Sequence, residues 1–311
     1  LVLSIVGIAC FVIMQSQKHT VASVTQAGVQ DAPSLPKSDF QPEVQDLKKE
    51  LHLDDVSPES ESAAASVHLT KERYFSKPII VDGQEFVQFS FPLKGKVRPF
   101  AYIGTSMKDR ADATGELKFP RNKPIYLVPA PNVLLKREFL GKFRPKEIRE
   151  VIVWPPFASD ALVIESAKVP GIEGFSIGGC TELTPAIIPA LSSLTGLKSF
   201  YAAKSRLKGS DLARLSFLPS LKLLMLSRCV GITPILSELK GSRNLETLVV
   251  SDTGIGASDY RLIASIPNLK VLVLDGNKIS STDLKQLARL SHLKELSLIN
   301  VHMNDVAAAK E

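Results

Sequence analysis

The most constraining feature of the sequence is a leucine that recurs every 24 residues. Its occurrences are Leu197, Leu221, Leu245, Leu269 and Leu293. Leu221, Leu269 and Leu293 open segments of the form L-x-x-L-x-L, of which residues 221–226 are the clearest copy. Looser copies open at Ile148 and Ile172, with one extra residue before Leu197, and a degenerate copy opens at Ile125. A single unit cannot bury its apolar face alone, so the period predicts a stack of repeats over residues 125–311.

The second half of each unit has the spacing of a helix. Apolar residues lie three apart at the same offsets in successive units, as in Leu212/Leu215/Leu218, Tyr260/Ile263/Ile266 and Leu284/Leu287/Leu290. This spacing places them on one helical face. The pairs Ser210-Asp211, Ser258-Asp259 and Thr282-Asp283 precede these runs, and we expect the helix N-caps there. Each unit is therefore predicted to be a strand, a turn, a short helix and a return.

The ninth residue of each unit supports a comparison with a known family. These residues are Cys180, Ser205, Cys229, Thr253, Asn277 and Val301. The pattern resembles the leucine-rich repeat family, whose consensus carries Asn or Cys at this point. The resemblance covers residues 148–311 clearly and 125–147 weakly. It implies an α/β solenoid with parallel strands on its concave face, in which the ninth residue satisfies backbone groups of the turn.

The outward positions of the strands predict a binding surface. Neighbouring residues of a strand alternate faces, so the third and fifth residues of each unit point away from the core. They are polar at both ends of the stack and apolar in the middle, where we expect one exposed patch: Tyr201, Leu223, Met225, Val249, Val271 and Val273. A charged rim is expected beside it: Lys204, Arg228, Asp252 and Asp275. Exposed apolar patches mark interaction sites, so we predict a protein or peptide ligand. The alternative is that β-branched residues simply suit strands, which does not explain Leu223 and Met225.

One enzyme-like motif, G-x-S-x-G, occurs at residues 174–178. In a hydrolase its serine lies on a sharp turn between a strand and a helix. The repeat instead places Ser176 within a strand, so we predict no enzyme in this chain and keep a hydrolase only as a remote alternative. No cofactor motif occurs, and we predict no cofactor. No metal is predicted either, because the five histidines form no ligand pattern: His19, His52, His68, His292 and His302.

The three cysteines are not expected to form a disulfide within the repeats. Cys180 and Cys229 share the ninth position but lie two units apart. Strands are about 4.8 Å apart, which separates their Cα atoms by roughly 9–10 Å. A disulfide requires less than about 7 Å. We therefore predict buried free thiols at both positions.

The first 65 residues differ from the rest in composition. Residues 1–14 are uncharged, and we expect them to be the end of a transmembrane helix that begins before residue 1, with a truncated signal peptide as the alternative. Residues 15–65 carry 4 basic and 9 acidic side chains and predict a disordered stalk. Few basic residues follow residue 14, so the positive-inside rule favours a single-pass protein with an extracytoplasmic repeat domain.

A small β-rich cap is predicted at residues 66–124. Asp82-Gly83 is a hairpin turn between strands expected at 78–81 and 84–91, and further strands are expected at 97–103 and 115–119. Residues 66–147 carry 16 basic and 8 acidic side chains. They lack the interleaved aromatic and basic pattern of nucleic-acid binders, so we predict a solvated basic face and no nucleic-acid partner.

These observations predict a membrane-tethered leucine-rich repeat module that recognises a protein or peptide on its concave face. The alternative is the sensor half of a larger receptor. The arrangement resembles bacterial membrane serine/threonine kinases, in which a kinase domain precedes the membrane span. No kinase motif occurs within residues 1–311, so that domain would lie before residue 1.

Overall fold

The computed structural model describes residues 76–91, 99–106, 108–135 and 137–303. The hydrophobic helix predicted at 1–14 and the stalk predicted at 15–65 lie outside these residues. Within the described ranges, no helix has the length and apolar character needed to cross a membrane.

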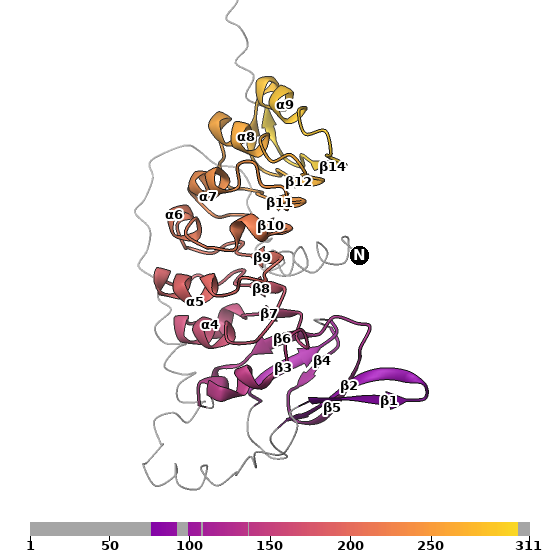
Figure 1. Ribbon diagram of the computed structural model, residues 1–311. Coiled ribbons are helices and arrows are strands. Elements are labelled where there is room, and N and C mark those ends of the chain that lie inside the picture. Colours follow the sequence, from indigo (N-terminus) through magenta and orange to yellow (C-terminus); the bar gives the residue numbers. More distant parts are fainter. Residues whose placement is uncertain (1–75, 92–98, 107, 136, 304–311) are drawn as a thin grey trace, which may run out of the picture. The chain divides into compact units, whose positions relative to one another are not determined.

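A ten-stranded sheet organises the described chain (Figure 1). In spatial order its strands are β14 (Glu295–Ser297), β12 (Val271–Val273), β11 (Thr247–Val249), β10 (Leu223–Met225), β9 (Ser199–Tyr201), β8 (Gly174–Ser176), β7 (Glu150–Ile152), β6 (Tyr126–Pro129), β3 (Ala101–Gly104) and β4 (Arg110–Asp112). The strands β6 to β12 and β14 pair in parallel, and from β7 onward each residue pairs with the equivalent residue of the next unit. At β6 the predicted unit start at Ile125 is wrong by one residue, because Tyr126, its second residue, pairs with Glu150, the third residue of the next unit. The predicted parallel sheet is confirmed.

Short helices follow the strands and lie on one side of the sheet (Figure 1). The α-helices are α4 (Asp160–Ser166), α5 (Ile188–Ser192), α6 (Gly209–Leu212), α7 (Thr233–Glu238), α8 (Ala257–Ile263) and α9 (Ser281–Leu287). The 3-10 helices are η1 (Pro131–Leu135), η2 (Arg137–Lys142), η3 (Pro155–Phe157), η4 (Pro185–Ile187) and η5 (Leu218–Ser220). This alternation of strand and helix is the one predicted for each repeat.

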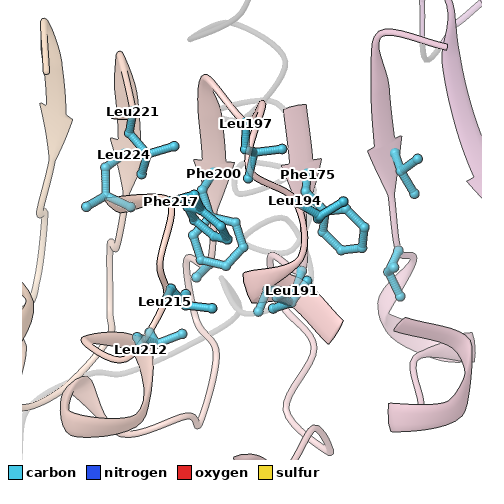
Figure 2. Packing of buried hydrophobic residues seen from close by; sticks show 14 of the residues in the cluster. Phe175, Leu191, Leu194, Leu197, Phe200, Leu212, Leu215, Phe217, Leu221 and Leu224 are labelled. Carbon is cyan, nitrogen blue, oxygen red and sulfur yellow. The ribbon is translucent and has the colours of Figure 1, made fainter. Parts of the chain in front are cut away.

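The core lies between the sheet and the helices. Strand residues at the first, fourth and sixth positions point into it, and Leu221, Leu224 and Leu226 are at most 1% exposed. Figure 2 shows Phe200 of β9 beside Phe217, with ring centroids 5.2 Å apart. The predicted interior positions are therefore confirmed in the middle of the stack. At β14 the equivalent residue Leu296 is 41% exposed, because no described strand packs beyond it.

The predicted helix N-caps are wrong by two or three residues. The caps are Gly256 for α8, Ser280 for α9 and Lys208 for α6. The predicted Asp259 and Asp283 lie instead at the third helical position. Their carboxylates accept hydrogen bonds from the backbone N–H groups of Gly256 (2.9 Å) and Ser280 (3.0 Å). An aspartate there reaches back to an N–H group that the helix leaves unsatisfied, so it resembles a cap in the sequence.

The β-rich segment before the repeats contains two kinds of strand. β1 (Ser76–Val81), β2 (Gln84–Phe91) and β5 (Gly115–Pro120) form an antiparallel sheet, and the predicted hairpin is confirmed. Its turn residues Asp82 and Gly83 both have positive φ angles, 48° and 76°, as this type of turn requires. β3 and β4 instead extend the ten-stranded sheet, since β3 pairs antiparallel with β6. A separate two-stranded ladder joins β13 (Lys278–Ile279) and β15 (His302–Met303).

Candidate binding face

The side of the sheet opposite the helices is the candidate functional site. Among the described elements, no helix or strand lies over this side, which we call the open face (Figure 1). The third and fifth residues of each unit point toward it, because the fourth and sixth residues fill the core.

The strand register brings the predicted apolar residues together. Leu223 pairs with Thr247 and Thr247 with Val271, which forms one row across β10, β11 and β12. A second row contains Tyr201, Met225, Val249 and Val273. The six residues are therefore contiguous, as expected. Their role in binding stays a prediction.

The expected exposure of these residues is wrong for half of them. Tyr201, Met225 and Val249 are only 6%, 2% and 5% exposed, whereas Leu223, Val271 and Val273 are half-buried. Met225 lies between Tyr201 and Val249, and Val249 lies between Met225 and Val273, about 4.8 Å from each neighbour. Val273 instead has the small Ser297 on one side. Side chains in such an in-register row shield one another, and the largest shield most. The three buried residues therefore form a floor, and the three half-buried residues keep apolar surface.

The predicted rim residues Lys204, Arg228 and Asp252 share an unusual backbone conformation. They stand at the eighth position of their units and have positive φ angles of 59°, 61° and 53°. The same position holds Gly179, Gly276 and Asn300, which also have positive φ angles. The backbone N–H of the eighth residue donates a hydrogen bond to the backbone carbonyl of the seventh residue of the next unit. For example, Arg228 N–H donates to Ser251 O at 2.8 Å. The left-handed turn thus follows every one of these strands and sets the edge of the open face.

The rim runs from basic to acidic, as predicted, but its acids are already engaged. Arg228 Nε lies 3.2 Å from the Asp252 carboxylate. Asp275 accepts hydrogen bonds from Ser297 Oγ (2.6 Å) and the Ile299 backbone N–H (2.8 Å). Partial burial and the neighbouring Arg228 charge lower the pKa of Lys204. The rim therefore offers a partner less free charge than the sequence suggests.

The ninth residues satisfy backbone groups, as the family resemblance implied. The Cys229 thiol donates to Ala202 O at 3.0 Å, and the Cys180 thiol donates to Val153 O at 3.6 Å. In the same role, the Asn277 side chain donates to Val250 O at 2.8 Å. Both cysteines are free and buried, which confirms the prediction. Burial raises the pKa of Cys180 to about 12 and that of Cys229 to about 11, so neither is a nucleophile at neutral pH.

The G-x-S-x-G motif does not form a nucleophile elbow. Ser176 ends strand β8, and its Oγ accepts a hydrogen bond from the Gly178 N–H at 3.4 Å. The described chain continues through a turn rather than directly into a helix. No group of three or more His, Cys, Asp or Glu side chains in the described ranges is placed to hold a metal.

A polar cluster on the open face was missed by the sequence reasoning. Glu150 of β7 is half-buried at the third position, beside Tyr126 of β6 and Gly174 of β8. Burial raises the pKa of Glu150 to about 7, although the neighbouring Arg149 lowers it. Burial and the Glu150 charge together raise the pKa of Tyr126 and of Tyr201. The sequence signal that could have revealed this cluster is an acidic residue at an outward position, Glu150, with a glycine, Gly174, at the same position of the next unit.

Comparison with known proteins gives similar solved structures only. No protein-family model and no curated protein matches the chain. Internalin C2 from Listeria monocytogenes is 26% identical, covers 50% of this chain and has a TM-score of 0.37. Another internalin from the same bacterium is 14% identical over 52% of this chain, with a TM-score of 0.32. A TDR receptor is 17% identical over 50%, with a TM-score of 0.32. The matches span 62%, 57% and 25% of those three chains.

The class of protein is defined by this chain's own repeats. The 24-residue period, the parallel in-register strands, the buried leucine positions and the ninth-position hydrogen bonds occur together. This combination makes the chain a leucine-rich repeat protein.

Proposed function

We propose that this chain is a membrane-tethered module that binds a protein or peptide on the open face of its sheet. The observation that carries the proposal is the row of adjacent strands whose outward side chains are apolar and which no described helix covers (Figure 1). The tether rests on the sequence alone, namely on the uncharged residues 1–14.

The open face has the composition of an interface centre. Leu223, Val271 and Val273 keep apolar surface that a partner would bury, at about 25 cal/mol per Å². Central apolar anchors carry most of the energy in protein interfaces, while charges at the rim tune rate and specificity. Arg228 and Asp252 stand at such a rim, and their existing ion pair limits their contribution.

A matched pair of variants tests this assignment. Peptides that bind the full chain would first be selected from a displayed random library. Their affinity for the wild type and for each variant would then be measured by calorimetry. Leu223→Asp should weaken binding at least tenfold, because it places a charge among the apolar anchors. Val230→Asp is the control, since Val230 is 70% exposed and lies in the loop after β10. Equal peptide affinity for Leu223→Asp and the wild type would remove the open face as the binding site.

The membrane tether needs its own experiment. The full chain should float with lipid vesicles in a density gradient and resist extraction at alkaline pH. A chain lacking residues 1–14 should remain in the soluble fraction. Flotation of both chains to the same extent would contradict a tether at residues 1–14.

The alternative function is the sensor half of a larger receptor kinase. It is favoured by an apolar segment that stands before the repeat domain rather than after it. Reading the gene upstream of residue 1 decides between the two. A glycine-rich loop and an H-R-D motif upstream of residue 1 would establish the receptor kinase. A short charged leader that begins at an initiator methionine would exclude it.

A further inference from the structure

We propose that the polar end of the open face is a subsite for a basic side chain of the bound partner, held between Glu150 and Tyr201. This inference rests on the proposed function and names the chemistry of one part of the ligand. We call the site the Glu150 notch, formed by Tyr126, Glu150, Gly174, Ser199 and Tyr201.

The notch exists because β8 has a glycine where its neighbours have side chains. Glu150, Gly174 and Ser199 pair in one row across β7, β8 and β9. A Cβ atom at Gly174 would lie only 2.8 Å from Glu150 Cγ and 2.8 Å from Ser199 Oγ. The side chains of the two neighbouring strands therefore lean over the glycine toward each other. This close approach brings an acid and a hydroxyl together from strands that are not adjacent.

The notch also contains a buried hydroxyl without a partner. Tyr201 is 6% exposed, and its hydroxyl has no hydrogen-bond partner in the described part of the chain. An interaction with the Ser199 side chain lowers the pKa of Tyr201. The Ser199 hydroxyl nevertheless donates to Glu173 O at 3.4 Å and does not reach hydrogen-bonding geometry with the phenol oxygen. Leaving a buried polar group unpaired destabilises the folded protein. A ligand that donates a hydrogen bond to this oxygen would remove that cost.

The charges around the notch favour a cation. Arg149, which directly precedes β7, has its guanidinium 3.6 Å from the Glu173 carboxylate and is therefore engaged beside the notch. In the part of the chain that the structure describes, Glu150 itself forms no ion pair. The remaining neighbours are Tyr126 from β6, Gly174 and Ser176 from β8, and Ser199 and Tyr201 from β9.

A guanidinium or ammonium group fits this arrangement. It would pair with the Glu150 carboxylate and donate a further hydrogen bond to Tyr201. Leu223 and Met225 follow on β10, beside Ser199 and Tyr201 of β9. The favoured ligand segment therefore carries a basic residue next to apolar residues.

The test uses small probes rather than an unidentified partner. N-acetyl-L-argininamide would be titrated into the full chain, with the tyrosine ring and glutamate carboxyl signals followed by NMR. N-acetyl-L-citrullinamide is the neutral control of the same shape. We expect saturable binding of the arginine probe and at least tenfold weaker binding of the citrulline probe. Equal affinity for the two probes would overturn the inference, and so would the absence of binding by either probe.

Two variants localise the effect. Glu150→Gln should weaken binding of the arginine probe at least tenfold, and Tyr201→Phe should weaken it severalfold while keeping the ring. Glu295→Gln is the matched control, because Glu295 holds the same third position on β14 and is exposed. Circular dichroism checks the fold of each variant. If Glu150→Gln folds and binds the arginine probe as tightly as the wild type, the notch is wrong. If Glu150→Gln does not fold, unchanged binding of the probe by Tyr201→Phe would contradict the notch instead.

The probe separates this inference from the proposed function. Leu223→Asp should not weaken binding of the arginine probe, because Leu223 lies on the strand beside the notch and an added carboxylate attracts a cation. If Leu223→Asp loses the selected peptides and the wild type does not bind the arginine probe, the binding face stands and the notch is wrong. If the arginine probe binds through Glu150 and Leu223→Asp keeps peptide affinity, the notch stands and the apolar face is wrong.

Discussion

The two halves of the open face share one backbone and differ in chemistry. Strands β7 to β9 present Glu150, Gly174 and Ser199 at the third position, with Tyr126 of β6 paired to Glu150, whereas strands β10 to β12 present Leu223, Thr247 and Val271. The register continues unbroken between the halves. The core beneath them is apolar in both, with Phe175 and Leu272 fully buried. Folding constrains the inward positions of a repeat, so the outward positions are free to carry recognition.

The largest expected effect tests whether the halves have equivalent cores. Phe175→Ala beneath the polar half should lower the free energy of unfolding by about 3–5 kcal/mol, and Leu272→Ala beneath the apolar half by about 2–5 kcal/mol. Both side chains are 0% exposed at the fourth position of their units. Urea unfolding followed by circular dichroism measures both losses. An unchanged midpoint for either variant would mean that its fourth position is not a core position.

The second prediction separates the floor of the apolar half from its surface. Met225→Asp should cost about 3 kcal/mol, because it leaves an unpaired charge at a position that is 2% exposed. Leu223→Asp, two residues away and half-buried, should cost less than about 1 kcal/mol. The same urea experiment compares them. Similar losses would show that the two outward rows are equally buried.

The third prediction concerns the polar half and its dependence on pH. The pKa of Glu150 rises from an ordinary 4.5 to about 7 in the folded protein, so folding favours the protonated acid. Stability is therefore lost as the pH rises from about 4.5 to about 7, and it stays low above that range. The neighbouring Tyr126 and Tyr201 have pKa values raised above the ordinary 10, so neither changes charge in this window.

A neutral variant measures this effect. At pH 8, Glu150→Gln should be more stable than the wild type by about 1–2 kcal/mol, a value reduced because Glu150 keeps partial exposure. At pH 4 the two proteins should have nearly equal stability. Thermal unfolding across this pH range checks the expectation. A difference that does not grow with pH would place the Glu150 carboxyl in a water-like environment.

The smallest effect is expected at the rim. Arg228→Ala should change the free energy of unfolding by less than about 0.5 kcal/mol, since its ion pair with Asp252 is exposed to solvent. It should weaken binding of a selected peptide modestly, and less at high salt. Calorimetry at two salt concentrations measures this. A loss of binding as large as that of Leu223→Asp would make the rim part of the interface centre.

The repeat architecture was predictable because the same apolar positions recur at regular intervals along the chain. The positions of Leu221, Leu224 and Leu226 recur with the period, so their burial follows from stacking alone. The free thiols of Cys180 and Cys229 were predictable for the same reason, because strand spacing sets their separation. The helix starts were less accurate, since aspartate serves both as a cap and as the third residue that reaches back to the cap.

The Glu150 notch was not predictable from the period. Glu150 and Tyr201 are 51 residues apart, and the extra residue between Ile172 and Leu197 interrupts the spacing that relates them. Only the register of β7, β8 and β9 shows that Gly174 lies between Glu150 and Ser199. The extension of the repeat sheet by β3 was also hidden, because antiparallel pairing with β6 leaves no repeat in the sequence.

The sequence by itself determined which side chains point inward, because a stack of 24-residue units has one periodic way to bury its leucines. It also determined which residues point outward on the strands, because side chains alternate. The tertiary structure decided how exposed those outward residues are. That depends on the size of the neighbours on adjacent strands, which shield Met225 and Val249 but leave Leu223 half-buried. Shielding is a property of the row across strands, and a row across strands is not contiguous in the chain.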